Sequence, residues 1–224
     1  MRRYVFPLIL GLVGVAILLS LGFWQLRRLE WKESLLGEIT AKIGADPLPL
    51  SAPGASEELK YTPVSVAGST TGQEILVLTG MQGSGAGYEV IAAFETAEGR
   101  RILIDRGFVP EDARRTPRPA VMLTITGNLH WPHETDKYTP PPDLAAGVWF
   151  ARDVPAIAAQ LGTEPLLVVA ASTTGDAQGI TPVPIGIEGI RNEHLNYAIT
   201  WFLLAAAWSG MTAFLLWRIR QKQF

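Results

Sequence analysis

The sequence predicts a membrane α + β protein. Two transmembrane helices, at the N- and C-terminal ends, flank a mainly antiparallel β sandwich or barrel-like extracytoplasmic domain with one or two short helices. Two apolar stretches, 4–24 and 195–217, predict the helices, because about 20 apolar residues cross the ~30 Å hydrocarbon core. Neither stretch has a charge in its interior. Seven short β-rich segments between them, separated by turn residues, predict the β domain.

These segments divide the chain into five parts. We expect a transmembrane helix over 1–24, a helical extension over 25–46, a β-rich domain over 47–190, a second transmembrane helix over 191–217 and a tail over 218–224. In the extension, Leu26, Leu29, Leu36 and Ile39 recur at helical spacing. Gly44 ends this pattern, so the first helix is expected to continue beyond the bilayer.

The positive charges next to the spans predict the topology. Basic residues precede the first span and follow the second, namely Arg2, Arg3, Arg218, Arg220 and Lys222. Because basic residues near spans stay in the cytoplasm, both termini are expected there and the central domain in the periplasm. Arg27, Arg28 and Lys32 argue weakly for the opposite orientation. No Arg-rich, Ser-rich transit sequence precedes the first span, which favours a multi-pass protein of a bacterial cell inner membrane.

The first apolar stretch has a second interpretation, a cleaved signal peptide. Ser20 and Gly22 would suit the positions that a signal peptidase reads. The apolar region is too long for a signal peptide, so an uncleaved anchor is favoured.

Composition excludes several classes of function. The net charge of −2 provides no basic surface for nucleic acid. The absence of cysteine excludes disulfides, covalent haem attachment and thiolate metal sites. With only four methionines, copper delivery is disfavoured as well. A lipid bilayer is the partner that composition supports.

The β domain is expected to contain seven strands and one helix. The strands are expected at 61–68, 74–79, 88–95, 101–105, 121–129, 147–151 and 166–171. The four glycines of 80–87 predict a flexible loop. Asp153 is expected to cap a helix that ends at Leu161, before Gly162. Residues 172–189 are expected to lead back to the second span as a loop.

The first motif, 21–32, straddles the end of the first span. Trp24 and Arg28 are typical of an aromatic belt with basic residues reaching the interface, which any anchor carries. Gln25 is not needed for anchoring, and Trp24, Arg28 and Trp31 fall near one helical stripe. This segment is therefore either an anchor or part of a site.

The second motif, 191–202, opens the second span at the same depth. His194, Tyr197, Trp201 and Trp208 lie on one helical face. A single interfacial histidine is often a hydrogen-bonded surface group. Its neutral imidazole can also ligate haem iron, with rings packing on the macrocycle and Arg27, Arg28 or Lys32 pairing with propionates.

The third motif is 104–110. From its residues it is a strand that ends at a turn at Gly107, with Asp105 or Arg106 facing solvent. Nothing else in the segment favours a functional role.

Other candidate sites are weaker. His130 and His133 lie three residues apart, but Pro132 breaks the helical register, so a metal site is not favoured. Residues 83–85 read Gly-Ser-Gly without the strand-to-helix context of a nucleophile elbow. A membrane-tethered hydrolase is therefore the least favoured class, and we expect the chain not to be an enzyme.

In this order, the motifs resemble those of the Surfeit locus protein 1 family of cytochrome c oxidase assembly factors. That family combines Leu-Gly-x-Trp-Gln-x-x-Arg, Tyr-x-x-Val-x-Val-x-Gly, Asn-Arg-Gly-Trp-Val-Pro and Asn-x-His-x-x-Tyr-Ala-x-Thr-Trp-Phe. The matching segments here are 21–28, 61–68, 105–110 and 192–202. Asp105 and Phe108 replace the Asn and Trp of the family pattern, and each keeps a polar turn group or a ring.

The resemblance implies an assembly factor for an aa3-type cytochrome c oxidase that assists the binding or insertion of haem a. The implied partners are the oxidase catalytic subunit or its assembly intermediates, with haem a synthase as a further candidate. His194 would be the metal-binding residue, as axial ligand of a transiently bound haem a. The side chains that would line the same junction are Trp24, Gln25, Arg28, Tyr197 and Trp201.

The alternative is a cofactor-free scaffold or accessory subunit that binds and stabilises the oxidase catalytic subunit. Small residues that permit close helix packing support it, namely Gly11 and Gly14 in the first span and Ala206 and Gly210 in the second. They could pack the two anchors on each other or on an oxidase helix, and the sequence leaves both possibilities open.

Overall fold

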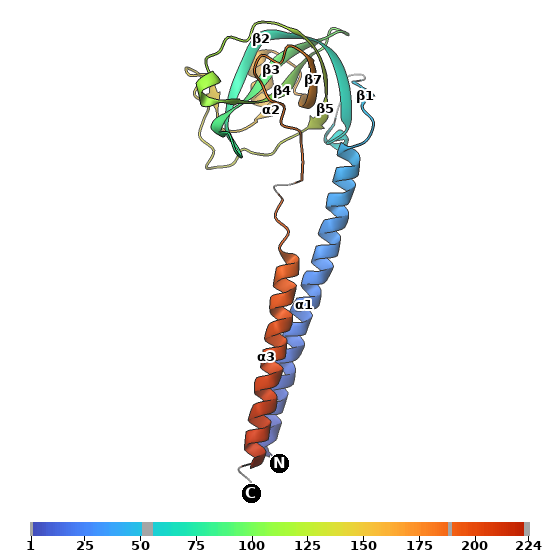
Figure 1. The fold of residues 1–224 in the computed structure, drawn as a ribbon, viewed down its shortest axis with the longest axis vertical. Helices are drawn as coiled ribbons and strands as arrows, with labels where there is room; N and C mark the ends of the chain where they lie inside the picture. The colour runs from blue at the N-terminus through green and yellow to red at the C-terminus, as the bar shows by residue number, and fades with distance from the viewer. Residues whose placement is uncertain (1, 51–55, 188–189, 222–224) are drawn as a thin grey trace. The chain divides into compact units, whose positions relative to one another are not determined.

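The computed structural model describes residues 2–50, 56–187 and 190–221, which form two compact units (Figure 1). We name them the helical unit, residues 1–38 with 187–224, and the β unit, residues 39–186. Lys222 and the last two residues of the expected 172–189 loop lie outside the described residues.

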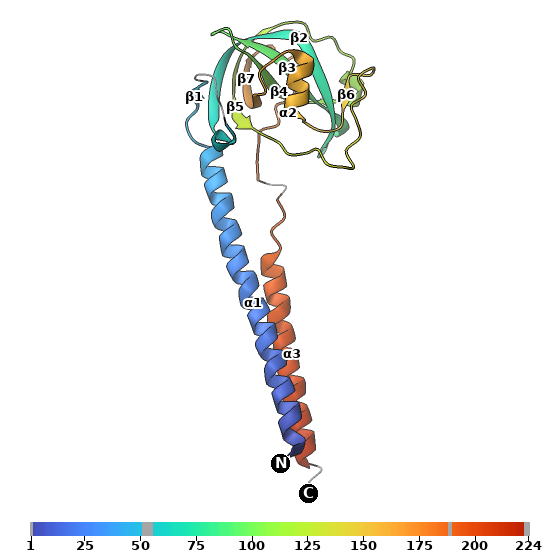
Figure 2. The ribbon, with the colours of Figure 1, turned by 180° about the vertical axis from the view of Figure 1, so that it is seen from behind.

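Two long helices make up the helical unit. α1 spans Arg2–Ile43, its last turn belonging to the β unit, and α3 spans His194–Gln221. They lie side by side and antiparallel (Figures 1 and 2). At ~1.5 Å per residue, α1 is about twice as long as the hydrocarbon core is thick, so its second half projects beyond a bilayer.

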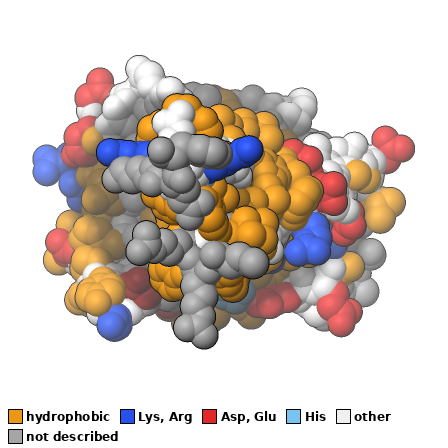
Figure 3. Space-filling view, turned by 90° about the horizontal axis from the view of Figure 1, so that it is seen from below, with side chains coloured by type: hydrophobic (Ala, Val, Ile, Leu, Met, Phe, Trp, Pro, Cys, Tyr) orange, Lys and Arg blue, Asp and Glu red, His pale blue; other side chains and the backbone are white. Residues whose placement is uncertain are grey.

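The helical unit fits a membrane protein because its apolar side chains face outward. Both helices are long and apolar enough to cross a membrane, and only 11% and 6% of their most apolar windows are buried. Hydrophobic side chains predominate around the helix pair when it is viewed along its length (Figure 3). Lipid is the surrounding that such a surface favours.

Glycines of α1 allow the two helices to approach closely. A Cβ added at Gly11 would lie 2.2 Å from the Thr212 side chain, and one at Gly22 would lie 2.6 Å from the Phe202 ring. Gly14 lies in the same way against Trp208. The small residues of the first span therefore pack the two anchors on each other, as small residues do at membrane helix interfaces.

The other small pair, Ala206 and Gly210, lies away from α1. Ala206 is exposed, and a Cβ added at Gly210 would meet no atom of the described residues within 4 Å. This face of α3 is open to lipid or to another helix.

The β unit is a closed barrel. Its five main strands are β2 (Pro63–Met81), β3 (Gly85–Thr96), β4 (Arg101–Pro110), β5 (Met122–His130) and β7 (Leu167–Gly175). Their order is β2-β3-β4-β7-β5, and β5 pairs back onto β2. Only β4 and β7 are parallel among these pairs of the described chain. Closure satisfies the barrel edges, so the barrel is the correct one of the two expected architectures.

Two short strands and one helix decorate the barrel. β1 (Leu48–Pro49) and β6 (Val148–Trp149) pair in parallel with β2. α2 (Val154–Leu161) begins as expected at Asp153, whose side chain accepts a hydrogen bond from the Ala156 N–H, and ends at Gly162 in the left-handed region. Two single turns of 3-10 helix complete the described elements, Glu57–Leu59 and Glu111–Ala113.

The core lies on both faces of the barrel wall. Phe94, Ile102, Ile104, Ile125 and Val168 belong to an inner cluster that draws side chains from all five barrel strands. Alternate residues point outward, where they pack on α2. Burial on both faces explains why β4 is apolar through most of its length rather than alternating.

Several expected boundaries differ from the structure, including the start of the 172–189 loop, because β7 continues to Gly175. The two strands expected at 61–68 and 74–79 are one strand, β2, bent by an irregularity between Thr70 and Glu74. The flexible loop expected at 80–87 is a tight hairpin, because β2 continues to Met81 and β3 begins at Gly85. The turn expected at Gly107 is also wrong, because β4 continues to Pro110, and Gly107, with a positive φ of 116°, lies where the pairing with β3 shifts register.

Candidate functional site

A polar contact joins the two helices of the helical unit where α3 begins. His194 is the first residue of α3, and its Nδ1 lies 2.7 Å from Oε1 of Gln25 on α1. Gln25 is only 9% exposed. This is a partly buried hydrogen bond between side chains 169 residues apart in sequence, at the end of the apolar part of α1.

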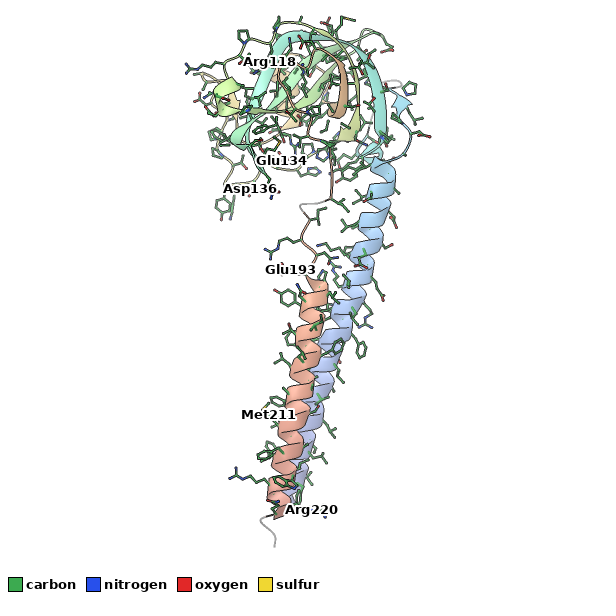
Figure 4. All side chains as sticks on the ribbon, in the orientation of Figure 1. Arg118, Glu134, Asp136, Glu193, Met211 and Arg220 are labelled. Carbon is green, nitrogen blue, oxygen red and sulfur yellow. The ribbon has the colours of Figure 1, made fainter. Side chains whose placement is uncertain are left out.

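The contact forms one wall of a pocket of about 390 Å³ within the helical unit. The pocket is lined by Gln25, Lys32, Arg191, Glu193, His194 and Tyr197. Figure 4 labels Glu193 at the start of α3, on the segment that lies beside α1. The volume falls within the range of small-molecule sites.

The charges of the pocket favour an anionic ligand. The Lys32 ammonium donates to the Arg191 carbonyl, and the Arg191 guanidinium pairs with the Glu193 carboxylate. Two cations and one carboxylate leave a net positive charge, and the N-terminus of α3 adds its partial positive charge. A carboxylate group is the kind of ligand that this arrangement attracts.

The structure brings together three of the six residues singled out from the sequence. Gln25, His194 and Tyr197 line the pocket. The pocket lining does not include Trp24, Arg28 or Trp201.

Trp24, Arg28 and Trp201 are close to the pocket residues in sequence, but their side chains do not line the pocket. Trp24 is 52% exposed, and Trp201 is half-buried on α3. The Arg28 guanidinium lies 3.9 Å from the centre of the Trp31 ring. An exposed cation–π pair of this kind suits the interfacial belt that the same residues also predicted.

Sequence reasoning offered Lys32 only as one of three candidate partners for propionates beside His194, and it did not group Arg191 and Glu193 with them. A signal was present on α1, since Gly11, Gln25 and Lys32 are separated by multiples of seven residues. Residues so spaced face one partner helix. Gly11 packs on α3, so the same stripe carries Gln25 and Lys32 towards α3 as well.

The pocket offers one imidazole, which suits a metal whose other ligands come from a cofactor. In the described part of the chain, no three His, Asp or Glu side chains are placed to hold a metal ion. A single imidazole suits haem iron, which needs one axial ligand from the protein. His194 offers that imidazole, and Lys32 and Arg191 are placed for carboxylates such as propionates.

A second polar cluster lies in the β unit around Arg152. Its Nη1 lies 3.3 Å from Asp105 Oδ2 and 3.4 Å from Glu89 Oε2, and its guanidinium also pairs with Glu134. Figure 4 labels Glu134. Burial raises the pKa of Glu89 to about 7 and raises the pKa of Asp105, with neighbouring carboxylates adding to both shifts. Three carboxylates thus share one guanidinium.

The expectation that Asp105 or Arg106 faces solvent is wrong. Asp105 is 2% exposed and accepts a hydrogen bond from the Gly107 N–H. Arg106 is 3% exposed and donates to the Gln178 side chain and the Ala177 carbonyl. The Asp at this position therefore accepts a backbone hydrogen bond that an Asn could also accept.

The β unit contains another buried arginine, Arg118. Arg118, labelled in Figure 4, pairs with Glu74 at 2.7 Å and donates to two backbone carbonyls. Arg106 lies close enough to both charges that each affects its pKa, which burial lowers. These are structural ion pairs, satisfied within the fold.

The histidines of the 130–133 segment have separate surroundings. His130 stacks on Tyr61, and burial lowers its pKa to about 4. His133 is exposed and lies 3.4 Å from the Glu57 carboxylate. The two side chains form no metal-binding group with other described residues.

The fold and site together define a class of protein. It has a small β barrel, two long apolar helices and a basic pocket between those two helices. The SURF1 family profile matches residues 12–206. The chain therefore belongs to the SURF1 family, whose members are known as cytochrome c oxidase assembly factors.

Similar proteins span most of the chain. Surfeit locus protein 1 of Xenopus tropicalis is 31% identical over 217 residues, covering 84% of this chain and 68% of that protein. The rat protein of the same name is 29% identical over 216 residues, covering 85% and 69%. The SURF1-like protein of Rickettsia felis is 29% identical over 210 residues, covering 87% of this chain and 89% of that protein.

Proposed function

We propose that this protein assists the assembly of an aa3-type cytochrome c oxidase by holding haem a for the catalytic subunit. The observation that carries the proposal is the His194–Gln25 contact in a pocket with two basic side chains. Family membership supports a role in oxidase assembly, and the pocket chemistry supports haem.

In this proposal each pocket side chain has a distinct role. His194 binds the iron through a ring nitrogen. Lys32 and Arg191 pair with the carboxylates of the macrocycle, and the Tyr197 ring packs against its edge. The haem supplies the iron and a large apolar surface, which the adjoining lipid-facing helices are suited to contact.

The proposed setting is a bacterial inner membrane, with both termini in the cytoplasm and the β unit in the periplasm. The support is the distribution of basic residues around the spans. The pocket then lies at the periplasmic end of α3. The oxidase catalytic subunit would receive haem there, and haem a synthase is the candidate donor.

A scaffold function is the second candidate, and one observation favours it. The Ala206–Gly210 face of α3 is exposed, although small residues spaced four apart usually mark helix–helix contacts in membranes. A helix of the oxidase catalytic subunit is the proposed occupant in that case. The protein would then hold the subunit during assembly without a cofactor.

An absorption spectrum and haem extraction distinguish the two candidates. The full chain would be purified in mild detergent from cells that synthesise haem a, as wild type and as His194→Ala. The matched control is His133→Ala, since His133 is an exposed histidine of the β unit.

We expect a Soret band from haem a in the wild type and in His133→Ala, with at least a tenfold loss in His194→Ala. A colourless wild type that still co-purifies with the oxidase would favour the scaffold. Failure to co-purify with any oxidase would count against both.

A further inference from the structure

We infer that Gln25 is a positioning residue that places the proton of His194 on Nδ1 and leaves Nε2 free to bind a ligand. The use of that nitrogen for haem rests on the proposed function. The tautomer itself follows from the geometry of the helical unit and can be measured without haem.

The hydrogen-bond chemistry of the two groups sets the tautomer. The Gln25 atom in contact is Oε1, which has lone pairs and no hydrogen. The 2.7 Å contact is therefore a hydrogen bond only if His194 Nδ1 carries the hydrogen and donates it. In a neutral ring with its proton on Nδ1, Nε2 has a free lone pair, which is the form that ligates metals.

Partial burial limits the choice of partners for the Gln25 amide. Gln25 is only 9% exposed, and its Oε1 faces His194 Nδ1. Reversing the amide would present its NH₂ group to Nδ1, leave Oε1 pointing elsewhere and place the ring proton on Nε2. The lone pair of that ring would then be on Nδ1 and occupied by the amide hydrogen, so the orientation of one amide determines whether Nε2 can bind a metal.

The helix packing explains why Gln25 reaches His194. Gly22, almost one turn earlier on α1, allows the Phe202 ring to approach, and the Phe23 ring meets Phe202 edge to face. This close approach brings position 25 within hydrogen-bond distance of the first residue of α3. The side chain at 25 is thus held by the backbone packing around it.

A neutral acceptor has an advantage over a carboxylate at this position. A glutamate would also accept from Nδ1, but its negative charge would stabilise the doubly protonated imidazolium. An imidazolium has no lone pair to offer. Gln25 orients the ring without favouring its cation, which keeps Nε2 available while Lys32 and Arg191 attract anions.

Nitrogen NMR tests the tautomer in the full chain without haem. The protein has three histidines, so ¹⁵N-histidine labelling gives few signals, and His194→Gln assigns those of His194. We expect a protonated Nδ1 and an unprotonated Nε2 in the wild type. Gln25→Leu should move the proton towards Nε2, whereas Gln25→Glu should retain it on Nδ1.

The control is Asn196→Leu, which makes a similar change at an exposed position of the same helix. It should leave the His194 shifts unchanged, which separates the loss of the acceptor from a general disturbance of α3. A wild-type ring with its proton on Nε2 would overturn the inference, and so would a Gln25→Leu variant with unchanged His194 shifts.

A titration with ferric protoporphyrin IX tests whether the His194 tautomer supports haem binding. Loss of an outer partner of a ligating histidine typically weakens metal binding by about 10–100-fold, so Gln25→Leu should bind that much more weakly than Asn196→Leu. A wild type that binds no porphyrin would overturn the proposed haem function. The nitrogen chemical shifts test the role of Gln25 without haem, so a failure of the Gln25 inference can be distinguished from a failure of the haem proposal.

Discussion

Arg152 is the residue on which the charge balance of the β unit depends. It is the cation that Asp105, Glu89 and Glu134 share, and its side chain is mostly buried. Removing one member of a buried ion pair costs more than the pair contributes, because the remaining charges stay desolvated.

Arg152→Ala should therefore lower the free energy of unfolding by about 3 kcal/mol or more. The measurement is thermal or denaturant unfolding of the full chain in detergent, followed by circular dichroism. Arg115→Ala, at an exposed position, is the matched control and should change stability little. Equal effects in the two variants would show that the cluster does not stabilise the fold.

Glu89 predicts a pH dependence of stability. Its pKa is raised from its ordinary value of 4.5 to about 7 in the folded protein, first by burial and then by Asp105. The folded state therefore binds more protons than the unfolded state between these pH values, so stability falls as pH rises from about 4.5 to about 7.

Glu89→Gln should remove this part of the pH dependence. The free energy of unfolding should then fall by about 2 kcal/mol less between pH 5 and pH 8 than it does in the wild type. Unfolding at the two pH values measures it. The exposed Glu98→Gln is the control and should keep the wild-type slope. A slope unchanged by Glu89→Gln would show that the carboxyl ionises normally.

The sequence located part of the site at the residue scale. His194 and Tyr197 stand out because rings and an imidazole recur on one helical face. Asp105 and Arg106 were expected in solvent because their partners lie far along the chain, with Arg152 47 positions after Asp105 and Gln178 72 positions after Arg106. Local sequence cannot show that a distant side chain neutralises a buried charge.

At the scale of elements, the pairing of α1 with α3 decides whether the pocket exists. The pocket is built from both helices, and the glycines of α1 set the distance between them. Gly22→Val should push the Phe202 ring away, because a Cβ there would lie 2.6 Å from it.

Cross-linking measures this effect, because the chain has no native cysteine. Cysteines at Gly11 and Thr212, which are in contact across the pair, should form a disulfide after a small separation of the helices, because their Cβ positions are 3.0 Å apart and a disulfide needs about 3.5 Å or more. Gly22→Val should reduce the yield severalfold, whereas Gly37→Val, at a position with open space among the described residues, should not. Equal yields would mean that the helices pair independently of Gly22.

Element types were easier to predict than element ends. α2 was predicted with both of its boundaries because Asp153 and Gly162 are local signals of helix ends. The lengths of β2 and β4 were underestimated because Gly68 and Gly107 look like strand ends in sequence, and Gly72 lies between the two segments that form β2. In the barrel, Gly72 and Gly107 adopt positive φ at irregularities inside long strands, where the register shifts and regular pairing resumes on either side. Strand pairing across the barrel is a tertiary property.

At the scale of the whole molecule, the proposed function requires the pocket and the β unit to lie outside the cytoplasm. The basic residues after the second span and before the first favour that orientation, while Lys32 and its neighbours oppose it weakly. Figure 4 labels Arg220 near the end of α3, beyond the apolar part of the helix. This terminal charge is the feature that should hold the C-terminus in the cytoplasm.

Reporter fusions measure the orientation directly. A fluorescent protein that matures only in the cytoplasm should be bright when fused after Phe224. Alkaline phosphatase, which is active only in the periplasm, should be active when inserted at the exposed turn around Asp136. Replacing Arg218 and Arg220 with Glu should reduce the bright C-terminal fraction, and replacing Arg115 and Arg191 should not, because neither residue follows the second span. A phosphatase inactive at Asp136, with the fold intact, would place the pocket in the cytoplasm and exclude delivery of haem from the periplasmic side.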